Sequence, residues 1–289
     1  ILCVFSQMVP PVQIFPLYIT AKIVYDMNRH FQGMPDYFLR QEGYFLIRSI
    51  LCVIFLIFVL ILSLPQYAVL AIIRRKNRQK SAQIGQRFVV WAAKGLTFIA
   101  GTRVIVRGFE NVPADTPVLY VGNHRSIFDI LTLYPYLKNN TGFGAKESLK
   151  YTQIVGWWMW FTNSLFLNRT DIKKGLQTIL EGIDLIKKGT SIVIFPEGTR
   201  SKTEDLLPFK EGSLKIAEKS KCPIIPVAIT NTESVFENHL PRIKKASVVI
   251  EFGTPIYLDH IDKTTKRHLA NHVRDIIIEM RKSHPTMIQ

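Results

Sequence analysis

Hydrophobic positions divide the chain into an apolar stretch near its beginning and a longer region in which two periodicities alternate. Residues 49–73 carry no charge, and Ile50 to Leu64 consists almost wholly of Ile, Leu, Val and Phe. That length exceeds the roughly 20 residues with which a helix crosses a bilayer. Pro65 interrupts the run, so the pattern predicts a membrane helix that spans, bends or re-enters. The alternative is a buried helix of a soluble core.

The basic flank of this run follows at once and contains no acidic residue. It consists of Arg74, Arg75, Lys76, Arg78 and Lys80. Such a flank is typical of the cytoplasmic side of a membrane and binds anionic lipid head groups. We therefore expect residues 44–80 to form a membrane helix with a basic flank, and everything downstream to be cytoplasmic. Residues 1–43 have no assignable role. Prolines interrupt residues 1–25 and no basic region precedes them, so a signal peptide is not expected.

Beyond residue 80, helical and strand patterns alternate. Apolar side chains at helical spacing predict helices at 82–98, 126–138, 171–188, 210–220 and 263–282. Short apolar runs predict strands at 103–107, 118–121, 191–195, 224–229 and 247–252. The alternation predicts one α/β domain over residues 81–289, with a mixed, largely parallel sheet flanked by helices and an N-terminal membrane-associated helical segment.

The composition narrows the class of partner. The chain is 47% hydrophobic and 20% charged, which excludes disorder, and its formal net charge is +15. A basic surplus favours anionic partners. No zinc-finger spacing or aromatic-rich RNA-binding pattern is present, so membrane lipids are expected rather than nucleic acid. Cys3, Cys52 and Cys222 show no metal or disulfide spacing, and the latter two are expected to be buried thiols in a reducing compartment.

The first candidate for chemistry is Gly122-Asn123-His124-Arg125-Ser126-Ile127-Phe128-Asp129, which follows a predicted strand. Ligands of α/β sheets bind beyond the carboxyl ends of strands. His124 and Asp129 are five positions apart, so they can meet only if His124 lies in the turn before a helix. A carboxylate on one imidazole nitrogen would leave the other to take a proton from a hydroxyl. Alternatively, Ser126 and Asp129 form a capping box and His124 is an ordinary turn residue.

The second candidate is Phe195-Pro196-Glu197-Gly198-Thr199-Arg200-Ser201, also at the end of a predicted strand. Gly198 permits close backbone approach. Arg200 offers a rigid fork for phosphate oxygens. The alternative is an ordinary proline turn in which Glu197 pairs with Arg200.

Together the two motifs resemble the glycerolipid acyltransferase family, whose best-known members are the 1-acyl-glycerol-3-phosphate acyltransferases. The resemblance covers residues 82–255. It includes the blocks Arg103–Gly108, Ala145–Leu149 with Gly156-Trp157, Leu167–Arg169 and Ile225–Val227. Asn168 stands where the family usually has a hydrophobic residue before its motif arginine.

The resemblance implies transfer of a fatty acyl group from acyl-CoA or acyl carrier protein to the sn-2 hydroxyl of 1-acyl-glycerol-3-phosphate, giving phosphatidic acid. It assigns His124 as the general base and Asp129 as its orienting partner. The residues implied for the acceptor's phosphate and its loop are Arg200, Lys146, Arg169, Glu197, Gly198 and Thr199. No acyl-enzyme, metal or cofactor is expected, because the acyl donor is a co-substrate and no Ser or Cys nucleophile is paired with the histidine.

Several alternatives stay open. The acceptor could be another lysophospholipid, glycerol-3-phosphate or another amphiphile with a hydroxyl, or the chain could be a non-catalytic lipid-binding membrane protein. A hydrolase is disfavoured because the sequence has no nucleophile elbow. The aromatic run at 156–161 could line an acyl-chain tunnel, rest at a membrane interface or pack in the core. The lysines at 173–174 and 187–188 fit a solvated helix face better than a docking site for a carrier protein.

Overall fold

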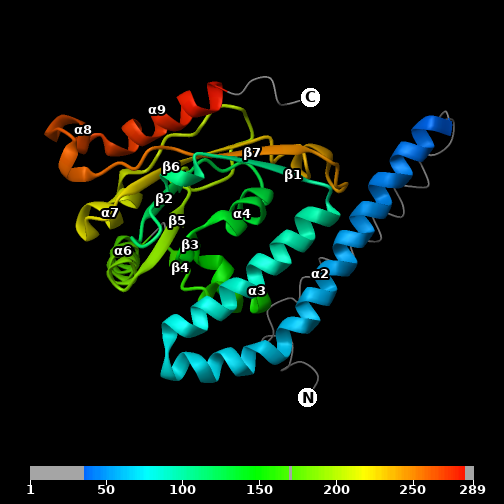
Figure 1. The fold of residues 1–289 in the computed structure, drawn as a ribbon, viewed down its shortest axis with the longest axis horizontal. Coiled ribbons are helices and arrows are strands. Elements are labelled where there is room, and N and C mark those ends of the chain that lie inside the picture. The colour runs from blue at the N-terminus through cyan, green and yellow to red at the C-terminus, as the bar shows by residue number, and fades with distance from the viewer. Residues whose placement is uncertain (1–35, 169–170, 284–289) are drawn as a thin grey trace, which may run out of the picture. The chain divides into compact units, whose positions relative to one another are not determined.

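The structure, a computed structural model, describes residues 36–168 and 171–283. The chain divides into two compact units, Ile1–Ile47 and Arg48–Gln289. Helix α2 (Asp36–Lys76) contains Pro65 and changes direction along its length (Figure 1). Proline removes a backbone donor and crowds the preceding turn, which kinks a helix. The predicted interruption is therefore a bend within one continuous helix.

Helix α3 (Arg78–Ile99) follows α2 after a single residue, Asn77, whose side-chain oxygen accepts the Lys80 N–H at 2.9 Å and caps the new helix. The two helices are joined again farther along, where the Ser81 hydroxyl donates to the Leu70 carbonyl at 3.1 Å. The helix predicted at 82–98 is confirmed and begins one turn earlier.

The described residues form a seven-stranded sheet of order β1-β7-β6-β2-β5-β3-β4. The strands are β1 (Arg103–Arg107), β2 (Leu119–Gly122), β3 (Asn140–Lys146), β4 (Leu165–Leu167), β5 (Thr190–Ile194), β6 (Ile224–Thr230) and β7 (Ser247–Phe252). Neighbouring strands are parallel except β6 and β7, which are antiparallel. The mixed, largely parallel sheet is thus confirmed. The carboxyl ends of β6, β2, β5, β3 and β4 lie at one edge, and those of β1 and β7 at the opposite edge.

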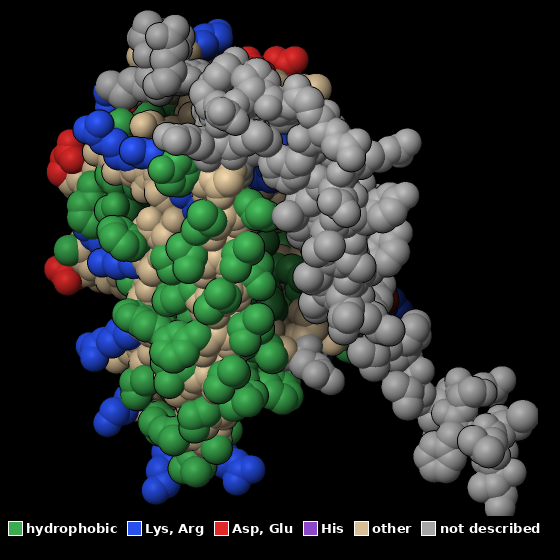
Figure 2. All heavy atoms as spheres, turned by 90° about the vertical axis from the view of Figure 1, so that its right-hand side faces the viewer, with side chains coloured by type: hydrophobic (Ala, Val, Ile, Leu, Met, Phe, Trp, Pro, Cys, Tyr) green, Lys and Arg blue, Asp and Glu red, His purple; other side chains and the backbone are tan. Residues whose placement is uncertain are grey.

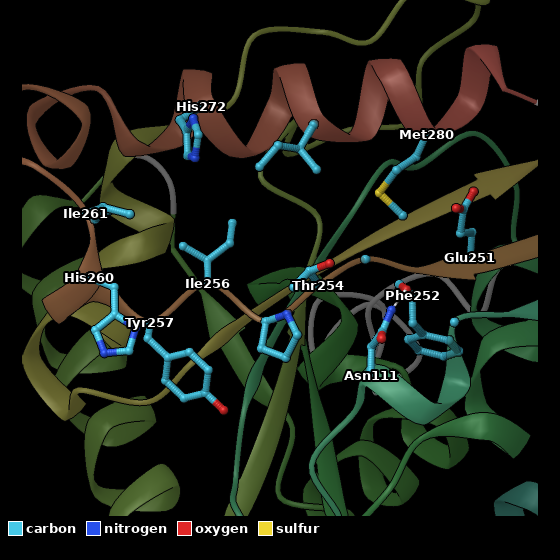
Figure 3. Close-up of a pocket in the computed structure, with 14 residues that line it drawn as sticks. Asn111, Glu251, Phe252, Thr254, Ile256, Tyr257, His260, Ile261, His272 and Met280 are labelled. Atoms are coloured by element: carbon cyan, nitrogen blue, oxygen red, sulfur yellow. Dashed lines mark hydrogen bonds between the residues drawn. The ribbon is translucent and has the colours of Figure 1, made fainter.

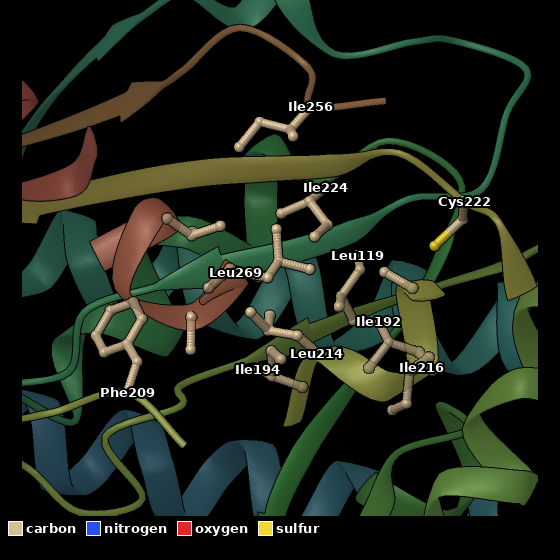
Figure 4. Close-up of a cluster of buried hydrophobic side chains, with 14 of the residues drawn as sticks. Leu119, Ile192, Ile194, Phe209, Leu214, Ile216, Cys222, Ile224, Ile256 and Leu269 are labelled. Atoms are coloured by element: carbon tan, nitrogen blue, oxygen red, sulfur yellow. The ribbon is translucent and has the colours of Figure 1, made fainter. Parts of the chain in front are cut away.

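Helices cover both faces of the sheet. Their bounds are α4 (Phe128–Leu133), α5 (Gln153–Phe161), α6 (Ile172–Lys187), α7 (Lys215–Ser220), α8 (Lys263–Arg267) and α9 (Leu269–Lys282). Successive strand residues point to opposite faces. Leu119 and Val121 accordingly pack with α6, α7 and α9, in the cluster of Figure 4, whereas Tyr120 packs with α3 and α4. Cys52 and Cys222 are buried free thiols, as predicted.

Three elements were not predicted: β3, β4 and α5. Strand β3 contains Gly142 and Gly144 and lacks an apolar run. Gly142 is required there because a Cβ would lie 2.2 Å from the Asn163 carbonyl oxygen. Strand β4 has only three residues, too few for a period to be visible. In α5 the apolar residues are nearly continuous, so no helical face stands out.

Three predicted helices are shorter than expected. The helix predicted at 126–138 is a six-residue α4 followed by a 3-10 turn that contains Pro135. The segment 263–282 is broken at His268, whose φ of −117° and ψ of 38° are not helical, into α8 and α9. The segment 210–220 begins as a 3-10 turn, so only its second half, α7, is α-helical.

Helix α2 presents an exposed apolar face. In the described part of the chain one helix, Gly43–Lys76, is long and apolar enough to cross a membrane. Ile54, Ile61 and Ile72 are each more than half exposed. Figure 2 shows hydrophobic side chains gathered on one face of the molecule, with Lys and Arg side chains at its margin. An exposed apolar patch of this kind marks an interaction surface.

Candidate functional site

The sheet brings the two predicted motifs to the same edge. His124 follows the end of β2, and Glu197 follows the end of β5, the strand beside it. Lys146 ends β3, on the other side of β5, and its side chain is exposed. Carboxyl ends of neighbouring parallel strands lie about 5 Å apart. Arg169, also predicted to bind phosphate, lies outside the described residues.

His124 and Asp129 are in contact. The His124 Nδ1 lies 2.7 Å from the Asp129 Oδ2. The Asp129 side chain is fully buried, while the imidazole is 18% exposed and stacks on the Phe195 ring with centroids 4.4 Å apart. An ionised carboxylate only accepts hydrogen bonds, so the Nδ1 carries a proton, and in the neutral imidazole the Nε2 then keeps its lone pair. The arrangement can therefore accept a proton at Nε2 and hold the resulting imidazolium against a buried anion.

The capping alternative is met in part, by the same carboxylate. Asp129 Oδ2 accepts the backbone N–H of Arg125 at 2.7 Å and of Ser126 at 2.8 Å. The Ser126 hydroxyl accepts the Phe128 N–H at 2.9 Å, where α4 begins. One carboxylate thus shapes the turn and faces the imidazole, so the two interpretations of Asp129 were not exclusive.

Glu197 ties the second motif to the first. Its Oε1 accepts the His124 backbone N–H at 2.7 Å, and its Oε2 accepts the Leu207 N–H at 2.9 Å. In return the Ser201 N–H donates to the His124 carbonyl at 2.8 Å. Burial raises the pKa of Glu197, and the two N–H donors oppose that shift. Glu197 therefore fixes the position of His124 through its backbone.

Arg200 does not pair with Glu197, so that alternative is wrong. Its Nη1 donates to Glu237 Oε1 at 2.9 Å, and its side chain is 52% exposed. Gly198 has a φ of +77°, which glycine adopts without strain, and it turns the loop so that Thr199 and Arg200 are exposed.

Four further residues hold the site together. Asn123 and Ile229 exchange two hydrogen bonds of 2.8 Å, which join the end of β2 to β6. Phe195 supports the imidazole by stacking. Thr232 donates from its hydroxyl to Asp129 Oδ1, and Glu237 accepts from the Ser126 hydroxyl. Asn123 and Phe195 lie inside the two motifs, so their places at the ends of predicted strands could have marked them as site residues from the sequence alone. Thr232 lies in the loop after β6 and Glu237 begins a short 3-10 turn, and neither position shows a sequence pattern.

Among residues 36–168 and 171–283, no cluster of three or more His, Cys, Asp or Glu could hold a metal ion. A cavity of about 520 Å³ lies elsewhere, lined by Asn111, Tyr257, His260, His272 and Met280 (Figure 3). It adjoins Gly108 and Gly253, at the carboxyl ends of β1 and β7. That is the sheet edge opposite His124, so the cavity is separate from the site of the two motifs.

The aromatic run of α5 divides between core and surface. Phe161 is buried and Trp158 stacks on Phe88 with centroids 4.6 Å apart, whereas Trp157 and Trp160 are about half exposed. The guanidinium of Arg74 lies 4.1 Å from the Trp160 ring centroid, within cation–π range. The core-packing alternative is therefore right for Trp158 and Phe161, whereas Trp157 and Trp160 lie at the surface.

Known proteins resemble this chain in sequence and fold. A model of the Acyltransferase family matches residues 103–230. The 1-acyl-sn-glycerol-3-phosphate acyltransferase of Escherichia coli (strain K12) is 30% identical over 234 residues, which cover 81% of this chain and 91% of that protein. The protein of that name from Saccharomyces cerevisiae is 32% identical over 190 residues, 65% of this chain. The chain spans 62% of the length of the yeast protein and 59% of a relative from Cocos nucifera.

A solved structure shares the fold. The crystal structure of the 1-acyl-sn-glycerophosphate (LPA) acyltransferase PlsC from Thermotoga maritima matches with a TM-score of 0.66 at 23% sequence identity. The match covers 83% of this chain and 98% of that one.

Proposed function

Since this chain belongs to the 1-acyl-sn-glycerol-3-phosphate acyltransferase family, we propose that it transfers a fatty acyl group from a thioester to the sn-2 hydroxyl of 1-acyl-glycerol-3-phosphate. The products are phosphatidic acid and a thiol. The observation that carries the proposal is the contact between His124 and the buried Asp129, beside the loop that bears Arg200. A proton acceptor and a cation for phosphate are the two groups that this reaction requires.

The proposed step uses His124 Nε2 as the general base. It takes the proton of the acceptor hydroxyl while that oxygen attacks the thioester carbonyl carbon. The carbon–sulfur bond then breaks, and the imidazolium returns the proton to the leaving thiolate. Asp129 stabilises the imidazolium meanwhile. Ser126 is not proposed as a nucleophile, because its hydroxyl is bonded to Glu237 and to the Phe128 N–H. The proposed step needs no metal.

Arg200 is proposed to bind the acceptor's phosphate, with Lys146 and Arg169. Arginine suits this role because its fork matches two phosphate oxygens. Lys146 supports the proposal because it ends the strand next to β5. Glu197 and Gly198 are proposed to shape the loop, with Thr199 beside Arg200 at its exposed tip. The Glu197 carboxylate accepts two backbone N–H groups. This suits a role in holding the loop in place rather than a role in contacting the anionic phosphate.

Membrane attachment is proposed for residues 44–80, with the acyltransferase domain, residues 81–289, on the cytoplasmic side. The exposed apolar face of α2 supports it. Two residues of the basic flank also serve the protein itself, because Arg74 and Arg78 donate to the Asn163 side-chain oxygen at 3.1 and 2.9 Å. The lipid-facing role is therefore proposed chiefly for Arg75, Lys76 and Lys80.

The test is a transfer assay with acyl-CoA and, separately, with acylated acyl carrier protein, each labelled in its acyl group. Comparing the two also identifies the donor. The acceptors are 1-acyl-glycerol-3-phosphate, a lysophospholipid with a choline head group, glycerol-3-phosphate and a monoacylglycerol without phosphate. Labelled phosphatidic acid formed in preference to the other products supports the proposal. Faster acylation of another acceptor would mean that this acceptor, and not 1-acyl-glycerol-3-phosphate, is the substrate. Absence of thiol release with every donor and acceptor would instead favour a lipid-binding protein.

A further inference from the structure

The segment that follows β6 reaches both motifs. We call residues 232–237 the bracing segment. Asn231, the residue before it, has a φ of +68° and donates from its side chain to the Ser247 carbonyl at 2.8 Å. Asparagine is among the residues that adopt this left-handed conformation most readily. The chain therefore turns sharply at the end of β6 and passes beside the ends of β2 and β5.

The first contact of the bracing segment is with the catalytic carboxylate. Asp129 is fully buried, and its Oδ2 accepts three N–H donors, among them the His124 Nδ1. Its Oδ1 accepts the hydroxyl of Thr232, which is 1% exposed. A buried anion requires donors on both oxygens. Thr232 holds Oδ1 while the N–H donors hold Oδ2, so both oxygens are fixed and Oδ2 stays aimed at the imidazole.

The second contact is an ion pair next to the histidine. Glu233 Oε1 lies 2.7 Å from Arg125 Nη1, and both side chains are nearly buried. Burial raises the pKa of Glu233, and the charge of Arg125 opposes that shift. The pair fixes the residue that follows His124 to the bracing segment.

The third contact joins the two motifs. Glu237 accepts from the Ser126 hydroxyl with Oε2, and from the Ile127 N–H with Oε1 at 2.9 Å. The same Oε1 accepts from Arg200 Nη1 at 2.9 Å. Among the described residues, this is the only hydrogen bond of the Arg200 side chain. A guanidinium has five N–H donors, so one contact fixes its place and leaves donors for a phosphate.

We propose that Thr232 and Glu237 are positioning residues of the acyl transfer site: Thr232 acts through Asp129 on the general base, and Glu237 acts on the acceptor's phosphate through Arg200. The inference rests on the proposed function and adds two residues from outside both motifs. The two roles predict opposite kinetic signatures. Loss of Thr232 impairs the chemical step, and loss of the Glu237 charge impairs acceptor binding.

The experiment compares the full chain with Thr232→Val, Thr232→Ser and Glu237→Gln. For each, kcat and the KM of donor and of acceptor are measured by thiol release, with the unfolding temperature of the same sample. Thr232→Val is expected to lower kcat at least tenfold with both KM values within twofold, because a bond to a charged group is lost. Thr232→Ser keeps the hydroxyl and is expected to recover most of kcat. Glu237→Gln is expected to raise the acceptor KM about three- to tenfold, with kcat and the donor KM within twofold, because the loss of one exposed ion pair is a modest change.

Two control variants match these changes away from the site. Thr178→Val removes the hydroxyl of another buried threonine, which donates to the carbonyls of Phe166 on β4 and Lys174 on α6. Glu279→Gln breaks an exposed pair with Lys282 of 2.8 Å. Both are expected to leave all three kinetic constants within twofold.

The outcomes separate this inference from the proposed function. If the unmodified chain transfers acyl groups but Thr232→Val has normal kcat, or Thr232→Ser is as impaired as the valine variant, the role of Thr232 is overturned. An acceptor KM that is unchanged or lower in Glu237→Gln overturns the role of Glu237, and a lower value would mean that Glu237 competes with the phosphate. Absence of transfer by the unmodified chain overturns the proposed function, and this inference with it.

Discussion

The geometry around Asp129 allows the effect of Asp129→Asn to be worked out atom by atom. If the amide oxygen takes the place of Oδ2, it keeps the bonds from His124 Nδ1 and from the N–H groups of Arg125 and Ser126. The amide NH₂ then faces the Thr232 hydroxyl, which can accept as well as donate. The reverse orientation would leave two buried N–H donors unpaired, at about 1–3 kcal/mol each. The backbone therefore selects the orientation that keeps the proton on Nδ1.

Only the negative charge is then lost, and its contribution can be bounded. A bond to a charged group contributes roughly 1.5–3 kcal/mol and a neutral one about 0.5–1.5, so the mid-range values differ by about 1.3 kcal/mol, or close to tenfold. Two unit charges 4 Å apart interact by about 4 kcal/mol at an effective dielectric constant of 20, which sets an upper bound of about 1000-fold. We expect Asp129→Asn to lower kcat by about 10- to 1000-fold.

The assay measures kcat with a chromogenic thiol reagent, and the unfolding temperature on the same sample. The unfolding temperature is expected to stay near that of the unmodified chain, because every hydrogen bond is retained. Asp184→Asn, which breaks an exposed pair with Lys188, is the control. A kcat within twofold of normal would reduce Asp129 to a helix cap and refute its role in catalysis. A loss well beyond 1000-fold in a normally folded variant would show that the amide reverses, and would refute the orientation argument.

Four further outcomes are expected. His124→Ala should lower kcat about 10²- to 10⁴-fold, the usual contribution of a general base, while the exposed control His268→Ala leaves it unchanged. Arg200→Ala should raise the acceptor KM about 10- to 150-fold, because a charge-assisted bond contributes roughly 1.5–3 kcal/mol, and Arg200→Lys should recover part of it; an equal rise for donor and acceptor would indicate a bracing role instead. After carbonate extraction at high pH the protein should stay in the membrane pellet, and its full release would contradict an integral segment. Treatment with EDTA followed by desalting should leave kcat unchanged; a loss that a divalent cation restores would contradict a metal-free step.

The central part of the fold could be predicted because its signals are local. Strands β6 and β7 are runs of β-branched residues buried on both faces, and their positions were predicted to within a residue. Strand β3 could not be, because its glycines are selected by the close approach of the Asn163 carbonyl, a contact between segments distant in sequence. Similarly, the end of α4 depends on how Pro135 enters the next turn.

The site divides in the same way. Five positions separate His124 from Asp129, so the spacing and the strand–turn–helix context were enough to predict that they can meet. The alternative in which Arg200 pairs with Glu197, the nearest acidic residue in sequence, is wrong because Glu197 is occupied by backbone donors. Glu237 reaches Arg200 only through the packing of β6 beside β2. Side chains that complete a site from another loop carry no periodicity and become visible only in three dimensions.

The bond between Thr232 and Asp129 spans 103 positions of the chain, and this separation orders events during synthesis. At 5–20 residues per second, about 5 to 20 s pass between the emergence of the two residues from the ribosome. Helix α2 precedes both, so the proposed membrane segment leaves the ribosome before the buried Asp129 carboxylate can accept the Thr232 hydroxyl. A nascent chain that ends before residue 232 therefore carries the proposed anchor but lacks part of the proposed site. The proposed anchor is thus complete first, and the proposed catalytic arrangement is complete last.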